Sequence, residues 1–191
     1  MSPTRVLAAS IVSLSLIAAG CTTTNPQSNP TSAPETRTSI DANVDAALQK
    51  LYAQAPDAQT MVRKARGVLV FPSVVSAGFV VGGSYGKGAL RVGGRTQGYY
   101  STTAASVGLL AGADSKAVYI LFMTDAALEK FRNSEGWTAG ADASVSVLKA
   151  GAAANADTQT VQQAVVGYVL TNAGLMANLA IDGTKVTRLM I

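Results

Sequence analysis

Glycines interrupt the apolar segments of residues 65–121 every few positions, and this spacing constrains the fold more than any other feature. The centre of the segment, residues 71–88, reads FPSVVSAGFVVGGSYGKG. Glycine tolerates positive φ and lets backbones approach closely, so short apolar runs separated by glycines are typical of packed strands joined by tight turns. The pattern therefore predicts a sheet of short, closely packed strands.

A phosphate-binding loop is the other interpretation of these glycines, and their spacing excludes it. Such a loop needs GxxxxGK followed by Ser or Thr, but Val81 stands where the first glycine belongs. Gly88 follows Lys87, so no hydroxyl is available for magnesium. The glycines are better explained as bends in strands.

Two helices are expected before the first strand. Ser39 can cap a helix that begins near Ile40, since apolar residues recur from there to Tyr52 on one helical face. Pro56 breaks this helix, and residues 58–65 predict a second, short one. Two interpretations remain open: the helices only pack on the core, or they form an amphipathic unit that touches lipid headgroups.

The rest of the chain predicts more strands than helices. The first strand covers residues 67–71 and ends at Pro72, and Gly86–Gly88 forms the turn of the next hairpin. A further turn at Gly93-Gly94 leads to later strands, and Asp182-Gly183 is a strong two-residue hairpin turn. The expected later strands are residues 99–103, 105–110, 117–123, 141–148, 161–170, 174–181 and 185–190.

One helix is predicted within this series of strands. Thr124 can cap a helix over residues 125–132 that buries Leu128 and Phe131, and Trp137 is placed in the loop that follows. Residues 150–157 are expected to form another loop. The fold class is α+β: a single domain with a strongly curved, mainly antiparallel sheet, sandwich- or barrel-like, N-terminal helices and one mid-chain helix.

The first twenty residues have the composition of an export signal. Arg5 precedes an apolar run of about fourteen residues, which is too short to span a bilayer. The run ends in LIAAG followed by Cys21, which resembles the cleavage and acylation motif of bacterial lipoproteins. Residues 1–20 are therefore predicted to be a lipoprotein signal peptide, although an ordinary secretory peptide with a chance cysteine is the alternative.

Cys21 is the only cysteine in the chain, which favours lipidation. A single cysteine forms no intrachain disulfide, and several acyl chains such as palmitate on one residue anchor a protein stably. Thr22 follows it rather than Asp, a position at which Asp tends to retain lipoproteins in the inner membrane. The expected location is the cell envelope, at the periplasmic face of the outer membrane.

A polar stretch separates this anchor from the folded part. Residues 21–39 are rich in Thr, Asn, Pro, Gln and Ser, a composition that cannot bury enough apolar surface to offset the entropy of ordering. We expect a lipidated, disordered tether there. Residues 40–191 then suit one domain.

Charge and residue types exclude several classes of function. The formal net charge is +4, and loss of Arg5 with the signal peptide would leave +3, which favours anionic surfaces only weakly. No run of Lys and Arg supports nucleic-acid binding. The chain has no histidine, so a Ser-His dyad and the commonest zinc ligand are absent. We expect neither an enzyme nor a bound cofactor or metal.

Several segments resemble the SYLF domain family, also called the lipid-binding or yeast actin-binding domain family. The likeness extends over about residues 40–191 in the expected order and is closest to the bacterial lipoprotein branch. The segments that carry it are residues 65–72, 77–83, 85–88, 122–125, 136–137, 140–145, 174–176 and 182–183.

This resemblance implies a module that binds phospholipids without catalysis. Relatives in eukaryotes bind phosphoinositide-rich membranes, and some bind actin; neither ligand is expected in a bacterial periplasm, so only a preference for anionic lipids transfers. Those relatives carry a basic residue shortly before the last Gly-Leu pair. At the corresponding place, residues 168–173, this chain has YVLTNA, which contains no basic residue.

Basic residues near the N-terminal helices and the glycine segment are the candidate contacts with lipid headgroups. Each surface cation is worth about 1 kcal/mol near an anionic leaflet, so several must act together. The alternative function is a structural lipoprotein that binds another envelope protein. The candidate residues are Lys50, Arg63, Lys64, Arg66, Lys87, Arg91 and Arg95.

Overall fold

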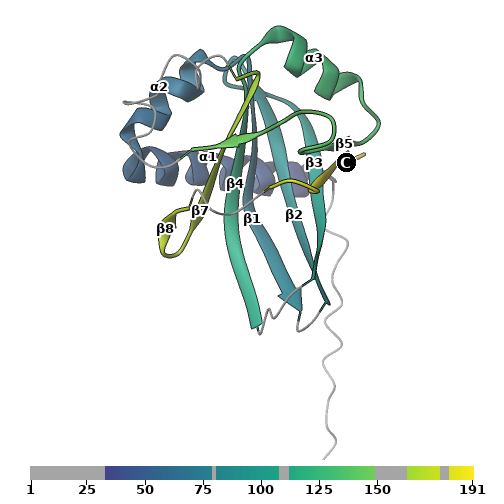
Figure 1. Cartoon of the computed structure of the whole chain (residues 1–191). Coiled ribbons are helices and arrows are strands. Elements are labelled where there is room, and N and C mark those ends of the chain that lie inside the picture. Colours follow the sequence, from purple (N-terminus) through teal and green to yellow (C-terminus); the bar gives the residue numbers. More distant parts are fainter. Residues whose placement is uncertain (1–32, 79–80, 108–111, 149–162, 177–180) are drawn as a thin grey trace, which may run out of the picture. The chain divides into compact units, whose positions relative to one another are not determined.

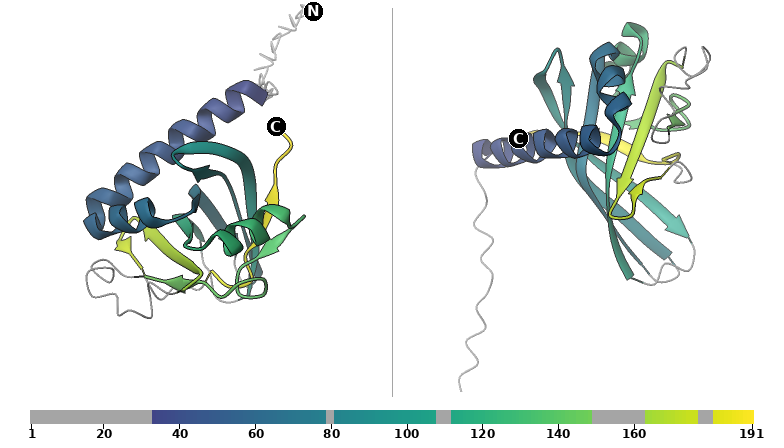
Figure 2. Two further views of the ribbon diagram at one scale, coloured as in Figure 1. Left: turned by 90° about the horizontal axis from the view of Figure 1, so that it is seen from above. Right: turned by 90° about the vertical axis from the view of Figure 1, so that its left-hand side faces the viewer.

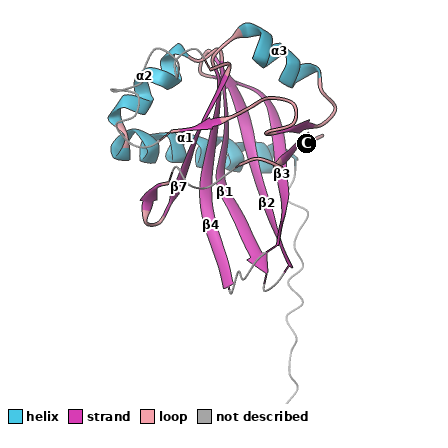
Figure 3. Ribbon diagram, viewed as in Figure 1, coloured by secondary structure: helices cyan, strands magenta, loops and turns pink. Residues whose placement is uncertain are grey.

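The computed structural model describes residues 33–78, 81–107, 112–148, 163–176 and 181–191. Residues from Thr31 to Ile191 form one compact unit (Figure 3). The described helices are α1 (Ala33–Gln54), α2 (Pro56–Lys64) and α3 (Asp125–Asn133). The described strands are β1 (Gly67–Gly78), β2 (Val81–Val92), β3 (Arg95–Val107), β4 (Gly112–Phe122), β5 (Trp137–Thr138), β6 (Ser146–Val147), β7 (Val165–Thr171), β8 (Gly174–Leu175) and β9 (Lys185–Arg188).

The strands form one open, strongly curled sheet, in the shape of a half-barrel (Figures 1 and 2). Their order is β5-β9-β3-β2-β1-β4-β7-β6, with β8 paired to β7. The described pairings are antiparallel except that of β6 with β7. Helix α1 crosses one face, and β1–β4 continue past it (Figure 1). The predicted α+β class, with a curved antiparallel sheet, two early helices and one in mid-chain, is confirmed.

The first strand does not end at Pro72, as the sequence predicted, but runs on to Gly78. Val70 pairs with Ala89 and Ser73 with Lys87, so β1 carries one more residue than β2 over this interval. The pairing of β1 with β4 also has one extra residue on β1 in this region. A bulge leaves one residue outside the ladder, and proline, which lacks an N–H, is tolerated there.

The predicted hairpin at Gly86–Gly88 is also wrong, because β2 passes through these residues without a turn. The turn lies instead at Gly93-Gly94, as predicted, with φ of 56° and 77°. Val92 pairs with Arg95 across this two-residue loop, which is the geometry of a tight hairpin. The third strand, β3, is likewise one strand where the sequence predicted two.

Helix α1 begins at Ala33 rather than near Ile40, so its first two turns lie in the segment predicted to be a disordered tether. Pro34 and Glu35 in the first turn suit a helix N-terminus, which overrides the polar composition of this stretch. Helix α2 starts at Pro56, which begins a helix instead of only ending one. Helix α3 is confirmed: Thr124 accepts a hydrogen bond from the N–H of Ala127 at 3.2 Å.

The C-terminal half departs further from the prediction. Trp137 lies in β5, not in a loop, and is 1% exposed. The strand predicted over residues 141–148 is reduced to β6. Gly183 has a φ of 78° in the expected turn, but the described pairings join β9 to β3 and β5, whereas β8, the described strand before it, pairs with β7. The loop predicted at residues 150–157 lies outside the described residues.

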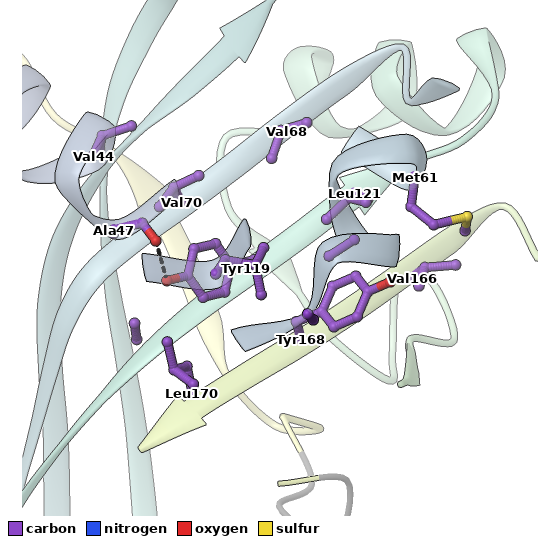
Figure 4. Packing of buried hydrophobic residues seen from close by; sticks show 14 of the residues in the cluster. Val44, Ala47, Met61, Val68, Val70, Tyr119, Leu121, Val166, Tyr168 and Leu170 are labelled. Atoms are coloured by element: carbon purple, nitrogen blue, oxygen red, sulfur yellow. Dashed lines mark hydrogen bonds between the residues drawn. The ribbon is translucent and has the colours of Figure 1, made fainter. Parts of the chain in front are cut away.

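Each face of the sheet carries a hydrophobic core. The first lies between the sheet and α1 and α2, where Tyr119 donates a hydrogen bond to the carbonyl oxygen of Ala47 at 2.8 Å (Figure 4). The second lies against α3, where Phe122, Phe131 and Trp137 meet edge-on or tilted. The buried hydrophobic residues of the described part all lie between residues 40 and 186, so the Thr31–Ile191 unit contains its own core.

Candidate functional site: a cationic cleft beside helix α1

A cleft of about 640 Å³ lies between α1 and the sheet. One wall is a single face of α1, and the floor comes from β1, β2, β4 and the end of β7. Its lining residues are Thr36, Ser39, Ile40, Asn43, Ala46, Ala47, Lys50, Pro72, Ser73, Lys87, Ser115, Lys116, Ala117, Tyr119, Leu170 and Asn172.

Helical spacing explains the α1 wall. Ser39, Asn43 and Lys50 follow one another at intervals of four and seven residues, so they lie on one side of the helix. Ile40 and Ala47, which are next to this side, are buried in the first core and hold the helix against the sheet. The polar side of α1 is thereby directed over the floor of the cleft.

Strand register explains the floor. Ser73 follows Pro72 in the β1 bulge and pairs with Lys87 of β2. The Ser73 hydroxyl lies 2.9 Å from the Ser115 hydroxyl of β4 and forms a hydrogen bond with it. Lys87 is two residues from Ala89, which is buried in the first core, so its side chain is on the α1 side of the sheet. The bulge thus sets hydroxyl groups beside an exposed ammonium group.

The charged residues of this cleft are all cations. Lys50, Lys87 and Lys116 line it, and no carboxylate is among the described lining residues. Lys116 precedes Ala117 on β4, and alternation places its side chain on the opposite face with Val118. Lys50 and Lys87 are therefore the ammonium groups on this side, and with hydroxyl and amide groups around them they can bind an anion.

The predicted lipid contacts do not all lie together. The structure brings Lys50 and Lys87 to the cleft. Arg63 lies at a second pocket of about 500 Å³, formed by α1, α2 and the Gly93-Gly94 turn. Arg66 is 3.4 Å from Asp125 in an exposed ion pair. Lys64 and Arg95 are exposed at the end of α2 and the start of β3.

Arg91 was predicted to contact lipid headgroups, but its charge is already paired within the domain. Its side chain is 15% exposed, and its Nη2 atom lies 2.8 Å from Asp45 and 3.5 Å from Asp41. It also donates a hydrogen bond to the carbonyl oxygen of Asp41 at 3.3 Å. Two carboxylates of α1 neutralise its charge, so its role is to attach α1 to the sheet.

Sequence reasoning missed the polar groups of the cleft. Ser73, Ser115 and Asn172 are ordinary surface residue types, and only pairing between distant strands brings them together. The polar residues of α1 could have been found, because Ser39, Asn43 and Lys50 share a helical face. The predicted lipidation site, Cys21, lies outside the described residues.

Among the described residues, no group of three or more His, Cys, Asp and Glu is arranged to hold a metal ion. None of the described helices is long and apolar enough to cross a bilayer.

Residues 103–189 match the family Ysc84, which is described as Las17-binding protein actin regulator. The match runs from within β3 to the residue after β9, so Lys50 and Lys87 lie before it. No curated protein matches the chain. Over residues 103–189 the match confirms the resemblance seen in the sequence, and it is consistent with a lipid-binding or actin-binding domain. Residues 103–189 therefore belong to the Ysc84, or SYLF, domain family.

Proposed function

We propose that this protein is a lipid-anchored component of the bacterial cell envelope that binds anionic phospholipid headgroups without catalysis. The observation that carries the proposal is the cleft beside α1, where Lys50 and Lys87 lie among hydroxyl and amide groups and no described lining residue is acidic. A phosphate diester suits such a site, since it offers oxygen acceptors and one negative charge.

The proposed lipid anchor would make a weak interaction between the domain and lipid headgroups sufficient for binding. Each cation near an anionic leaflet is worth about 1 kcal/mol, which alone gives modest affinity. Acylation of Cys21 would hold the domain close to a bilayer and raise the effective lipid concentration. Since Thr22 follows Cys21, the periplasmic face of the outer membrane is the proposed location.

Vesicle sedimentation of the unlipidated Thr31–Ile191 unit tests the headgroup site. We expect more protein to pellet with vesicles containing phosphatidylglycerol or cardiolipin than with phosphatidylcholine alone, and less at high salt. Replacement of both Lys50 and Lys87 by Gln removes about 2 kcal/mol, which corresponds to a ~30-fold weaker interaction.

Arg132 and Arg188 provide the matched control. Both are exposed, and Arg132 lies on α3, on the other side of the sheet. The double replacement Arg132→Gln and Arg188→Gln removes the same charge and is expected to leave pelleting within about twofold. Equal pelleting with neutral and anionic vesicles, or equal loss in both double variants, would contradict a site in the cleft.

A second candidate is a protein-binding lipoprotein. The description of the matched family names a protein partner, Las17, and so favours recognition of a protein; actin itself is not the expected partner in an envelope. Affinity capture from detergent-solubilised envelopes distinguishes the two functions. A stoichiometric partner that is retained by the Lys50→Gln and Lys87→Gln variant, without dependence on lipid, would favour this alternative.

A further inference from the structure

Large hydrophobic side chains are exposed on the part of β1 and β2 that continues past α1. Val75 is 49% exposed, Tyr85 48% and Val81 69%. Val75 and Tyr85 pair directly across the two strands. Three exposed apolar groups thus gather on one hairpin, away from both cores.

These side chains are on the same face of the sheet as the cationic cleft. Tyr85 and Val81 are two and six residues from Lys87, so alternation along β2 directs all three to the α1 side. On β1, Ser73 of the cleft and Val75 are also two residues apart, so their side chains lie on the same face of the sheet. The views in Figures 1 and 2 show this end of β1–β4 extending beyond α1.

The charge of this face complements an anionic surface. The register places Lys87 and Lys185 on this face, the latter through its pairing with Thr103 of β3. Asp114 of β4 pairs with Ser76 and so lies on the opposite face. No described strand residue contributes a carboxylate to this side.

We propose that this end of the sheet enters the interface of an anionic bilayer, with Val81 deepest and Tyr85 and Val75 behind it. A strand rises about 3.3 Å per residue, so Val81 lies ~13 Å from Tyr85 and Tyr85 ~7 Å from Lys87. Interfacial segments penetrate about 5–10 Å into the headgroup and acyl boundary. At that depth Tyr85 lies at headgroup level, which tyrosine favours, and Lys87 reaches phosphates from just outside.

This docking mode rests on the proposed headgroup function and adds the orientation in which the domain meets the bilayer. A bilayer is the occupant favoured over a protein surface for two reasons. The apolar residues lie on the same face as the cationic cleft, and no carboxylate is found among the described lining residues of the cleft or among the described strand residues of that face.

Tryptophan fluorescence in the Thr31–Ile191 unit tests the depth of this face. The native Trp137 is 1% exposed and provides a constant background. With vesicles that contain phosphatidylglycerol, a Tyr85→Trp variant is expected to shift its emission to the blue and to be quenched by nitroxide-labelled lipid. A Glu129→Trp variant on α3, exposed on the other side, is expected to show neither change.

Adjacent residues on opposite faces provide a second, independent test. Val75→Asp puts a negative charge on the proposed docking face and is expected to weaken vesicle binding about tenfold. Ser76→Asp adds the same charge one residue later on the other face and is expected to change binding less than twofold. Circular dichroism confirms that both variants are folded.

The outcomes separate the two proposals. If the native unit does not prefer anionic vesicles, the headgroup function and the docking mode both fail. If it does prefer them, but Tyr85→Trp is not quenched and Val75→Asp binds like the native unit, the docking mode alone is overturned. Loss of an envelope protein from Val75→Asp, without quenching at position 85, would assign the face to a protein partner and would equally overturn it.

Discussion

Gly88 is a position where the packing of two strands leaves no room for a side chain. A Cβ atom there would lie 2.0 Å from the carbonyl oxygen of Val70 and 2.7 Å from Cδ1 of Phe71. Both neighbours belong to β1 at the start of its bulge. Gly83, on the same strand, has only the Ala104 carbonyl oxygen nearby, at 3.8 Å.

Alanine at these two glycines is expected to have opposite effects. Gly88→Ala forces the strands apart and costs about 1–3 kcal/mol of unfolding free energy, as overpacked sites do. Gly83→Ala fits without strain and is expected to be neutral or to stabilise by up to about 1 kcal/mol, because alanine loses less backbone entropy on folding. Urea unfolding of the Thr31–Ile191 unit measures both values. Similar effects of the two substitutions would contradict the close approach at Gly88.

At the scale of elements, α1 is attached to the β2–β3 hairpin by a polar cluster as well as by its apolar face. The carboxylate of Asp41 accepts hydrogen bonds from Thr96 at 2.7 Å and Tyr99 at 2.8 Å. Arg91 joins the same cluster and also contacts Asp45. Since α1 forms one wall of the cleft, this cluster also positions the candidate site.

Removal of Asp41 is expected to loosen α1. Asp41→Ala leaves the hydroxyls of Thr96 and Tyr99 without their acceptor and removes one of the two carboxylates beside Arg91, which costs about 2–3 kcal/mol. The side chain of Asp45 is 67% exposed and makes one ion pair, so Asp45→Ala is the control, with an expected cost below about 1 kcal/mol. Urea unfolding gives both costs, and amide exchange reports whether α1 opens. Equal costs would show that Asp41 has no special role.

At the scale of the whole domain, two buried tyrosines link its stability to alkaline pH. Burial, and then the negative charge of Asp57, raises the pKa of Tyr168 to about 12. Burial also raises the pKa of Tyr119 above its usual value of 10.0. A raised pKa means that the folded state retains the proton longer than the unfolded chain does. The resulting stability is fully present below pH 10 and is lost as the pH rises through the folded value.

We therefore expect the unfolding free energy to fall between pH 10 and about 12, by up to about 1.4 kcal/mol per pH unit for each tyrosine. Tyr168→Phe is expected to reduce this slope with little effect at pH 7, because the Tyr168 hydroxyl makes no hydrogen bond within the described structure. Tyr119→Phe also reduces the slope but costs about 1 kcal/mol at pH 7, since its bond to Ala47 is lost. Urea unfolding at a series of pH values checks these slopes. An unchanged slope in both variants would refute the assignment.

Much of the fold was predictable because many of its signals are local. The apolar face of α1, with Ile40 and Val44, and the capped helix α3 depend on residues within about four positions of each other. The Gly93-Gly94 turn depends on the positive φ of two adjacent glycines. The glycines of β2 gave the wrong turn, because Gly86 and Gly88 are needed for space against β1 and not for a change of direction.

The candidate site was predictable only in part. Lys50 and Lys87 were both proposed as lipid contacts, and both line the cleft. Arg91 was proposed on the same grounds, but its environment depends on α1, whose Asp41 and Asp45 lie about fifty positions earlier in the chain. Sequence distance gives no indication of such an ion pair.

By itself, the sequence determined the fold class, the family resemblance and the kinds of residue that could meet an anionic lipid. The tertiary structure decided which of these residues act together. The bulge at Pro72 sets the register that brings Ser73 beside Lys87, and the docking of α1 brings Lys50 over the same strands. Both depend on contacts between residues distant in sequence, whose energies add only when the sheet has formed. The physical reason is that local patterns specify elements, whereas strand register and helix docking specify a site.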